Sequence, residues 1–198
     1  MSSGTRMIVG AALAGSILLA APPTAESQSA VVGHRSYSEG PIKNFSVVWA
    51  HKLTRSAMPL NDAGWAWLRS QGVRSIVTFR NDSDFDYPKR GFTDVLRLPL
   101  TNHIFPTDQQ AERFLAFIQD PVHQPVHMHC EAGRDRTGMM TALARYAVDG
   151  WPLEKALAEA SLFRKGKPLH DNRIEWLQAW AARHPPGSAR LEREVGKR

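Results

Sequence analysis

The stretch from Val126 to Gly138, VHMHCEAGRDRTG, constrains the fold and chemistry of this chain more than any other. The segment before Cys130 is apolar and β-prone, and a largely apolar helical pattern follows Arg136. A short loop, residues 131–135, joins the two and has Gly133 at its centre. Because a strand that turns through a short loop into a helix directs successive backbone N–H groups at one point, we predict a phosphate-binding loop here.

The residue types in this loop predict nucleophilic attack on phosphorus. Gly133 permits a backbone conformation that a side chain would forbid, and the planar guanidinium of Arg136 can bind two phosphate oxygens at once. A helix N-terminus and a guanidinium lower the pKa of a nearby thiol from about 8.5 to roughly 3.5–7.5. We therefore expect Cys130, the only cysteine, to be a thiolate nucleophile. Thr137 can donate its hydroxyl to the sulfur when the sulfur leaves.

The string H-C-x5-R-T-G, which starts at His129, resembles the signature of the cysteine-dependent phosphatases, in their dual-specificity branch. The resemblance implies a cysteinyl-phosphate intermediate on Cys130 and a supporting role for His129 in holding the thiolate. It also implies that the phosphate is bound by the loop residues Glu131, Ala132, Gly133, Arg134, Asp135 and Arg136. The loop is not the nucleotide-binding form G-x4-G-K-[ST], because no lysine follows a glycine pair at that spacing.

The proton donor to the leaving group is where the chain departs from the family pattern. The resemblance places an aspartate on a loop before the cysteine, but Asn102 stands at that position and an amide cannot donate a proton in this way. Asn102 is therefore kept only as a supporting residue. Three substitutes remain open: Asp135, Asp108 and His103. Asp135 matches a bacterial subset with G-[KR]-D-R-T and joins Cys130 in the catalytic set, although it could instead orient the arginine or a water.

Asp108 could instead cap a helix, and His103 could simply be a solvated loop residue.

Other polar residues give weaker indications of function. His127 and His129 alternate on the strand before the cysteine, but no fourth ligand is spaced to join them, so we expect no metal and no other cofactor. Arg134, Lys165 and Lys167 are candidates for a basic rim that binds further phosphates of the substrate, or are exposed charges.

The overall composition fits a single enzyme domain with an anionic substrate. The chain has 198 residues and a formal net charge of +6. Neither a zinc-finger spacing, nor an internal repeat, nor an aromatic-rich basic groove is present in the sequence, so we expect no nucleic-acid partner. With one cysteine an intramolecular disulfide is impossible, and we expect a monomer.

The two ends of the chain differ from its middle. Residues 1–30 resemble an export segment, with Arg6 before an uncharged apolar run at 8–21. That run is short for a membrane-spanning helix, but prolines obscure a cleavage site. We therefore expect either a signal peptide or an uncleaved N-terminal membrane anchor, and a periplasmic or secreted domain over residues 33–184. Residues 185–198 are expected to be a disordered charged tail.

Alternating strand and helix patterns predict an α/β sandwich around a mostly parallel sheet, with the loop at the carboxyl end of a central strand. The resemblance likewise implies the three-layer fold of dual-specificity phosphatases over roughly residues 42–183. We expect strands at 45–49, 73–79, 95–100 and 126–129, and a turn at 55–59. We expect helices from Asn61 or Asp62 to 72, from Thr107 or Asp108 onward, and at 137–148, 153–163 and 172–183, the last capped by Asp171.

Several functions remain open. The first is an exported phosphatase acting on phosphotyrosine protein or another phosphomonoester. Inositol phosphates and phosphoinositides are alternative substrates, because the subset with aspartate in the loop includes lipid phosphatases. The second function is a phosphate-binding module with little turnover, as Asn102 suggests. The third is a rhodanese-type sulfur carrier, against which Arg136, Thr137 and Gly138 count.

Overall fold

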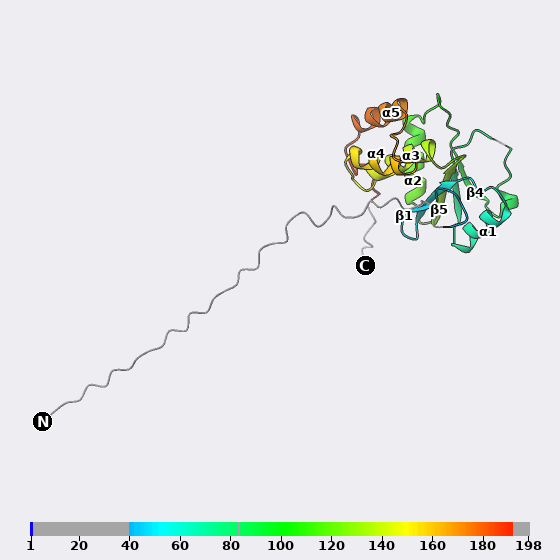
Figure 1. The fold of residues 1–198 in the computed structure, drawn as a ribbon, viewed down its shortest axis with the longest axis horizontal. Helices are drawn as coiled ribbons and strands as arrows, with labels where there is room; N and C mark the ends of the chain where they lie inside the picture. The colour runs from blue at the N-terminus through cyan, green and yellow to red at the C-terminus, as the bar shows by residue number, and fades with distance from the viewer. Residues whose placement is uncertain (2–39, 83, 192–198) are drawn as a thin grey trace. The chain divides into compact units, whose positions relative to one another are not determined.

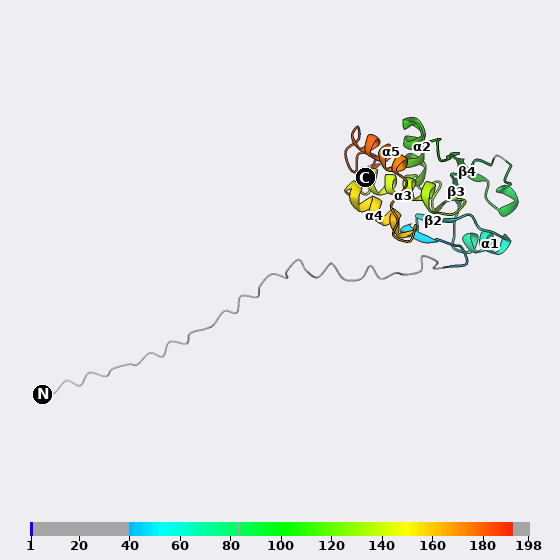
Figure 2. The same cartoon turned by 45° about the horizontal axis from the view of Figure 1, so that its top comes forward.

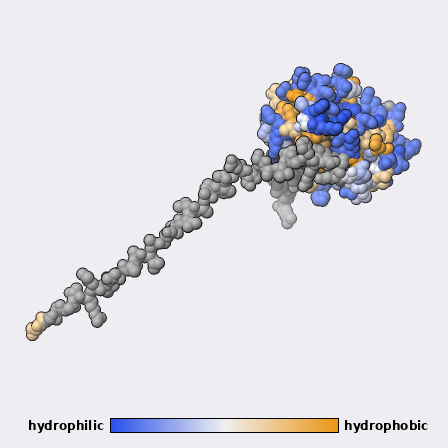
Figure 3. Space-filling view, in the orientation of Figure 1, coloured by the Kyte–Doolittle hydropathy of each residue, from blue (hydrophilic) through white to orange (hydrophobic). Residues whose placement is uncertain are grey.

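The computed structural model describes residues 40–82 and 84–191, together with Met1. The predicted export segment, residues 1–30, and the end of the chain after Leu191 lie outside the described residues. Among the helices that are described, none has the length and apolar content needed to cross a membrane. The face of the folded part shown in Figure 3 is mostly hydrophilic, with hydrophobic residues in separate patches.

A five-stranded sheet forms the centre of the fold, in the order β1-β2-β5-β3-β4 (Figure 1). The strands are β1 (Ser46–Trp49), β2 (Leu53–Ala57), β3 (Ser75–Thr78), β4 (Asp94–Arg97) and β5 (Val126–Cys130). β2, β5, β3 and β4 are parallel to one another, whereas β1 is antiparallel to β2. The sheet is therefore mostly parallel, as predicted, and β5 is its middle strand.

Helices cover both faces of this sheet (Figures 1 and 2), which confirms the three-layer α/β sandwich. The helix α1 (Asp62–Ser70) and the short 3-10 helix η2 (Pro88–Arg90) lie on one face and enclose a cluster that contains Trp65, Phe92 and Ile76. The helices on the other face enclose the larger cluster, which contains Met128 and Phe114. They are α2 (Asp108–Gln119), α3 (Asp135–Ala147), α4 (Leu153–Leu162) and α5 (Asp171–Ala181).

The alternation of side chains along β5 decides which face receives the cysteine. Met128 and Cys130 belong to the larger cluster, beneath α2–α5. The buried rings of His127 and His129 lie on the other face, where His129 is 5.7 Å from the ring of Trp65. Cys130 therefore leaves the sheet on the side where α3 begins.

The turn predicted at residues 55–59 is wrong for most of that stretch, because β2 continues to Ala57. Arg55 and Ser56 are polar and yet buried, so the strand lacks the apolar pattern that would have identified it. Both find partners inside the fold: Ser56 Oγ lies 2.9 Å from Nε2 of His127, and Arg55 binds the loop that follows β5.

The helix starts are close to those predicted. Asn61 caps α1, and Thr107 caps α2 in a reciprocal capping box, so Asp62 and Asp108 are first helical residues instead of caps. The predicted cap at Asp171 is wrong by one residue, because Asp171 is the first residue of α5.

The segment that follows α5 is held against the rest of the fold up to Leu191, the last residue of this segment that the structure describes. The backbone N–H groups of Gly187 and Ala189 and the guanidinium of Arg190 donate to carbonyl oxygens at the C-terminal end of α3. Those carbonyls have no partner within the helix itself. The prediction of a disordered tail is therefore corrected for residues 185–191, whose donors satisfy the end of a central helix.

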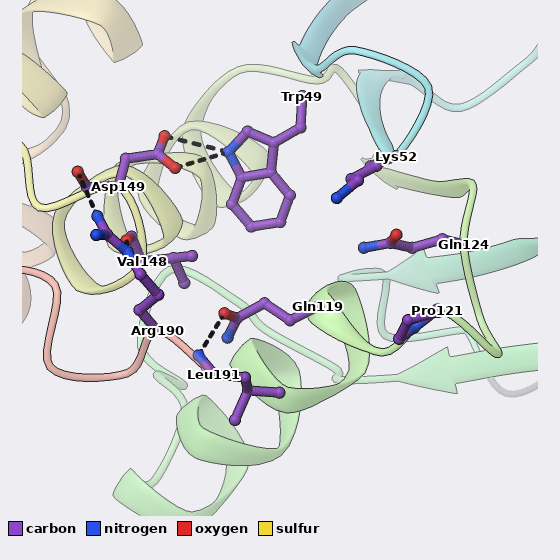
Figure 4. Close-up of a pocket in the computed structure, with 9 residues that line it drawn as sticks. All are labelled: Trp49, Lys52, Gln119, Pro121, Gln124, Val148, Asp149, Arg190 and Leu191. Carbon is purple, nitrogen blue, oxygen red and sulfur yellow. Dashed lines mark hydrogen bonds between the residues drawn. The ribbon is translucent and has the colours of Figure 1, made fainter. Parts of the chain in front are cut away.

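A cavity of about 970 Å³ lies beside this segment (Figure 4). Within it the indole N–H of Trp49 donates to both carboxylate oxygens of Asp149, at 2.9 and 3.1 Å, and Leu191 N–H donates to Gln119 Oε1. No residue that lines it belongs to the loop after β5. The cavity is therefore separate from the predicted catalytic chemistry.

Candidate active site

Residues 130–137, from the end of β5 through the connecting loop into the first turn of α3, are called the cradle from here on. Its carbonyl groups are fixed outward by donors from other segments. Cys130 O and Glu131 O accept from the N–H of Met58, at 2.9 and 3.2 Å, and Ala132 O accepts from Asn44 Nδ2 at 2.7 Å. Because the C=O and N–H of a trans peptide point in opposite directions, these contacts turn the next N–H groups inward, as an anion-binding nest requires.

Gly133 has to be glycine for two independent reasons. Its φ of +64° lies in the left-handed region, as its predicted role in the loop requires. A Cβ at this position would also lie 2.3 Å from Ala57 N and 2.4 Å from Ser56 C, at the end of β2. The cradle therefore rests directly on the backbone of β2.

Arg55 supports the cradle from below and was missed by the sequence analysis as a site residue. Its buried guanidinium donates from Nη2 to Gly133 O at 2.5 Å and from Nη1 to Thr141 Oγ1 at 3.2 Å. The guanidinium carbon lies 3.6 Å from the ring centre of Phe163. Burial lowers the pKa of Arg55 to about 10, against the opposing effect of the negative charge on Cys130, so the side chain remains a cation at neutral pH.

Cys130 has the electrostatic environment of a thiolate. Burial by itself would raise the pKa of the thiol, but the hydroxyl and backbone N–H of Thr137, the charge of Arg136 and the N–H of Gly133 together lower that pKa below its usual value. The hydroxyl oxygen of Thr137 is buried and has no oxygen or nitrogen partner among the described residues. Its proton is therefore free to point at the sulfur.

Arg136 is held at the mouth of the cradle by backbone carbonyls. Its Nη1 donates to Phe79 O at 3.1 Å and to Leu100 O at 3.2 Å, at the ends of neighbouring strand segments. The remaining guanidinium nitrogens make no hydrogen bond to the described residues. Because α3 begins at Asp135 instead of the predicted Thr137, Arg136 stands in the first turn, at the positive end of the helix.

His129 contacts the backbone of the cradle and not the sulfur. Its Nδ1 lies 3.3 Å from Cys130 O, and its Nε2 lies 3.0 Å from the hydroxyl of Tyr87. Burial lowers the pKa of His129 to about 4, against the opposing effect of the Cys130 carbonyl. A neutral imidazole at neutral pH thus braces the first peptide of the cradle. Its predicted role in holding the thiolate stays a prediction.

The loop that follows β4 contains Asn102 and is fastened to α5. Asn102 is exposed; its backbone carbonyl accepts from Asn172 Nδ2 at 2.9 Å, and its Oδ1 accepts from Arg173 Nη2 at 3.3 Å. The exposed Asp108 pairs with Arg183 at 2.8 Å.

The remaining proposed donor on this loop, His103, is also exposed, and its backbone N–H donates to Thr101 Oγ1. Within the described part of the chain, the side chains of Asn102, His103 and Asp108 make no hydrogen bond to the cradle. Asn102 and His103 thus lie on the loop after β4 and Asp108 begins α2, and the hydrogen bonds of their side chains are made outside the cradle.

Asp135, the candidate inside the cradle, lies next to an arginine and a histidine. Its carboxylate forms an ion pair with Arg164, and its Oδ1 lies 3.5 Å from His170 Nε2. These groups line a cavity of about 360 Å³. The complete lining is Arg134, Asp135, Arg164, Lys165, Lys167 and His170. The predicted basic rim is thus brought together, and two members that the sequence missed, Arg164 and His170, are added.

The pair His127 and His129 does not form part of a metal centre in the described chain, where no group of three or more His, Cys, Asp or Glu side chains could hold a metal ion. Both ring nitrogens of His127 are used, at 2.9 Å from Thr54 Oγ1 and 2.9 Å from Ser56 Oγ. Burial, followed by the charge of His129, lowers the pKa of His127 well below its ordinary value. His127 is a neutral core residue.

Cys130 is buried, has a lowered pKa and lies on a nest of N–H groups between a central parallel strand and a helix, beside an arginine. This combination defines a cysteine-dependent phosphatase site. The family comparison agrees with this class. The family model "DSP-PTPase phosphatase fused to NAD+ Kinase" matches residues 52–176, which include β2, the cradle and the first half of α5. The chain belongs to this family of dual-specificity-type phosphatase domains.

Individual relatives agree with the family. The chain is 35% identical over 108 residues to the dual specificity protein phosphatase TpbA of Pseudomonas aeruginosa, covering 54% of this chain and 49% of TpbA. It thus spans about half the length of that curated relative. A solved structure of P. aeruginosa TpbA with phosphotyrosine is 31% identical, with a TM-score of 0.50 and coverage of 58% of this chain and 71% of that one.

The fold is also shared with more distant proteins. The catalytic core of Siw14 from Saccharomyces cerevisiae, described as a PP-IP phosphatase, matches with a TM-score of 0.60 over 74% of this chain and 95% of that one. Because the two sequences are only 19% identical, this likeness concerns the fold alone.

Proposed function

We propose that this protein hydrolyses phosphomonoesters through a cysteinyl-phosphate intermediate. The observation that carries the proposal is the lowered pKa of Cys130 in a cradle whose carbonyl groups are fixed outward. Family membership supports the same reaction. The free nitrogens of Arg136 and the inward N–H groups bind the oxygens of the transferred phosphoryl group, where negative charge is spread in the transition state.

The reaction has two steps. In the first, the sulfur of Cys130 forms a bond to phosphorus while the bond from phosphorus to the ester oxygen breaks, and the leaving oxygen takes up a proton from solvent water. In the second, water attacks phosphorus and releases a proton to the solvent, the S–P bond breaks with its electron pair left on the sulfur, and inorganic phosphate forms. The hydroxyl of Thr137, which has no other partner, then stabilises the departing thiolate.

The contacts of Asp135 and Asp108 favour roles other than proton donation. Arg164 favours the ionised form of Asp135, which suits a group that orients neighbouring arginines better than an acid. Asp108 is occupied by Arg183. We therefore propose an enzyme that depends strongly on the leaving group, because no carboxylic acid of the described chain is free beside the cradle.

Turnover of an aryl phosphate compared with an alkyl phosphate tests this function. The expected result is rapid hydrolysis of the aryl ester, slow hydrolysis of the alkyl ester, and loss of both in Cys130→Ser by about 10³-fold or more. Hydrolysis of neither ester by the wild type would indicate a binding module. Formation of thiocyanate from thiosulfate and cyanide would instead indicate a sulfur carrier.

Phosphotyrosine protein is the first substrate class that we propose, because a relative at 31% identity binds phosphotyrosine. Incubation with tyrosine-, serine- and threonine-phosphorylated peptides tests this, with faster release of phosphate from the tyrosine peptide as the expected result. Equal rates for all three peptides would contradict the preference.

We further propose that the protein works outside the cytoplasm as a monomer. The location is supported by the residue pattern of segment 1–30. Fractionation of the native host and light scattering of the purified protein test these two points. Recovery only from the cytoplasm would contradict the first, and a stable dimer the second.

Inositol phosphates or phosphoinositides are a second candidate substrate class, favoured by the basic cavity next to the cradle. Four cationic side chains, on Arg134, Arg164, Lys165 and Lys167, line this cavity together with one carboxylate, that of Asp135. This excess of positive charge suits an anion that carries more than one phosphate.

The double variant Lys165→Gln/Lys167→Gln tests the second candidate. We expect KM for an inositol polyphosphate to rise by about 10-fold or more, while kcat/KM for an aryl phosphate stays within about twofold. Lys89→Gln is the matched control, because Lys89 is an exposed lysine paired with Asp86 on η2. Equal KM values for the double variant and the control would contradict this candidate.

A further inference from the structure

Arg173, in the first turn of α5, is buried beneath the loop that contains Asn102. Its side chain is 1% exposed. One nitrogen, Nη2, donates to Thr101 O at 3.2 Å and to Asn102 Oδ1 at 3.3 Å, and the guanidinium carbon lies 5.7 Å from the ring centre of Phe105. The side chain therefore holds the backbone and the side chain of this loop at the same time.

The rest of this guanidinium has no partner in the part of the chain that the structure describes. Nε and Nη1 are buried and make no hydrogen bond there, and no described carboxylate pairs with Arg173. A buried cation with unsatisfied N–H groups is costly unless a negative charge compensates it. Such groups need an explanation, and a site for a charged ligand is a common one.

Arg173 and Arg136 bind consecutive carbonyls of one loop: Arg136 donates to Leu100 O and Arg173 donates to Thr101 O, each at 3.2 Å. The buried guanidinium therefore lies beside the cradle, and the charges of the cradle act on it. Burial lowers the pKa of Arg173, and the positive charges of Arg136 and Arg164 lower it further, whereas the negative charge of Cys130 raises it. Two of these groups, Cys130 and Arg136, belong to the cradle. Cys130 is thus the group whose negative charge acts on the unpaired guanidinium, and a bound phosphoryl group would add negative charge on the same side.

We propose that Arg173 is a positioning residue that fixes the Asn102 loop against the mouth of the cradle and keeps a second positive charge, besides Arg136, available to the thiolate and the phosphoryl anion. This inference rests on the proposed phosphatase function. It also gives Asn102 a role: its neutral amide accepts a hydrogen bond from Arg173 without cancelling the charge. An aspartate at this position would form an ion pair with Arg173 and withdraw that charge from the cradle.

The test combines three variants with a readout that does not depend on turnover. Arg173→Met removes the charge, Arg173→Lys keeps it without the planar fork, and Asn102→Asp neutralises it in place. Arg183→Met is the matched control, because Arg183 follows the same helix, binds Asp108 at the start of α2 and is half exposed. For each protein, the rate of Cys130 alkylation by uncharged iodoacetamide is measured across pH, together with kcat and KM for an aryl phosphate.

We expect the pH of half-maximal alkylation to rise by about half a unit or more in Arg173→Met and Asn102→Asp. It should stay near the wild-type value in Arg173→Lys and Arg183→Met. In Asn102→Asp, kcat for the aryl phosphate should fall by about 3- to 10-fold, with KM changed less. Inorganic phosphate should protect Cys130 from alkylation less well in Arg173→Met than in the control.

Two results would overturn the inference. One is an alkylation profile of Arg173→Met that matches Arg183→Met, with thermal unfolding showing that both are folded. The other is faster hydrolysis of an alkyl phosphate by Asn102→Asp, since the added carboxyl group would then act as an acid. If Arg173→Met does not fold, Asn102→Asp retains the buried arginine and decides the matter. Absence of Cys130-dependent turnover in the wild type would instead refute the proposed function, while the alkylation profiles would still test Arg173.

Discussion

The cradle and the Asn102 loop both border the proposed site, yet they are built in opposite ways. The cradle is held from beneath by Met58, Asn44 and Arg55, which leaves its N–H groups and one arginine facing the substrate. The Asn102 loop is held from the side by α5, and its own polar groups are used for that attachment. The cradle keeps its polar groups free to bind a phosphate, whereas the polar groups of the Asn102 loop are used in hydrogen bonds that hold the loop in place.

The cradle and the Asn102 loop therefore bear on different parts of the reaction, namely attack by the thiolate and protonation of the leaving group. Formation of the thiolate and binding of phosphate depend mainly on the cradle, because Thr137, Arg136 and Gly133, which lower the pKa of Cys130, all belong to it; the charge that we propose for Arg173 adds to theirs. Protonation of the leaving group needs a free acid, and the Asn102 loop shows none in the described chain. Substitutions in the cradle should therefore slow the hydrolysis of all substrates. Substitutions in the Asn102 loop should act through the charge near the thiolate and the position of the loop.

Arg136→Lys should have the largest effect. Lysine keeps the positive charge but cannot bind two phosphate oxygens while donating to Phe79 O and Leu100 O. We expect kcat/KM for an aryl phosphate to fall by about 10³-fold. Arg74→Lys, at an exposed arginine that binds Val122 O, is the control, and a similar loss there would show that the effect is not specific to the cradle.

Gly133→Ala should damage both activity and stability. The new Cβ would clash with the backbone of β2, and the alanine would also have to adopt the left-handed conformation that the loop requires at this position. We expect kcat to fall by about 10²-fold and the free energy of unfolding to fall by about 1–3 kcal/mol or more. Gly72→Ala separates the two causes, since Gly72 has a φ of +77° with nothing within 4 Å of the added carbon. Equal losses in urea unfolding would refute the clash with β2.

His129 should make the fold sensitive to acid. Its pKa is about 4 in the folded protein and about 6.5 when unfolded, so between these values the unfolded chain binds more protons. Stability should therefore be lost as pH falls from 6.5 to 4, by about 3 kcal/mol from this residue. His129→Asn should show a smaller loss in urea unfolding over the same range. A parallel pH dependence in variant and wild type would contradict the prediction.

Arg55→Met should impair catalysis moderately. The loss of the hydrogen bond to Gly133 O lets the cradle shift, while a methionine stem can still pack near Phe163. We expect kcat to fall by about 10-fold with a small change in melting temperature. Arg55→Lys should lie between wild type and Arg55→Met, and an unchanged kcat in both would show that the cradle needs no support from β2.

Asp108→Asn should have the smallest effect. Its carboxylate pairs with the exposed Arg183, and an exposed pair contributes about 0–1 kcal/mol. The pH profile of kcat should keep its shape, with activity within about twofold of wild type. Loss of the basic limb in this variant would identify Asp108 as the proton donor and reopen the comparison between the two regions.

The cradle was predictable from the sequence because its determinants are local. Strand, loop, Gly133, Arg136 and the following helix are consecutive, so their spacing alone predicts the geometry. The three-layer fold followed in the same way from alternating patterns, apart from β2, where buried Arg55 and Ser56 disguise a strand as a turn.

The supporting residues were not predictable in this way. Arg55 and Arg173 are both distant in sequence from the groups that they bind: Arg55 is 78 residues from Gly133, and Arg173 is 71 residues from Asn102. An arginine in a polar stretch gives no local signal that it is buried. Only the packing of β2 beneath the cradle and of α5 against the Asn102 loop brings these two cations to the site.

The pH dependence of Cys130 alkylation in the wild-type protein tests the central claim most directly. We predict a half-maximal rate well below pH 8.5, the value of about 8.5 being that of an unperturbed thiol, and complete protection by saturating inorganic phosphate. A thiol that titrates at or above about 8.5, or one that phosphate leaves equally reactive, would contradict the account.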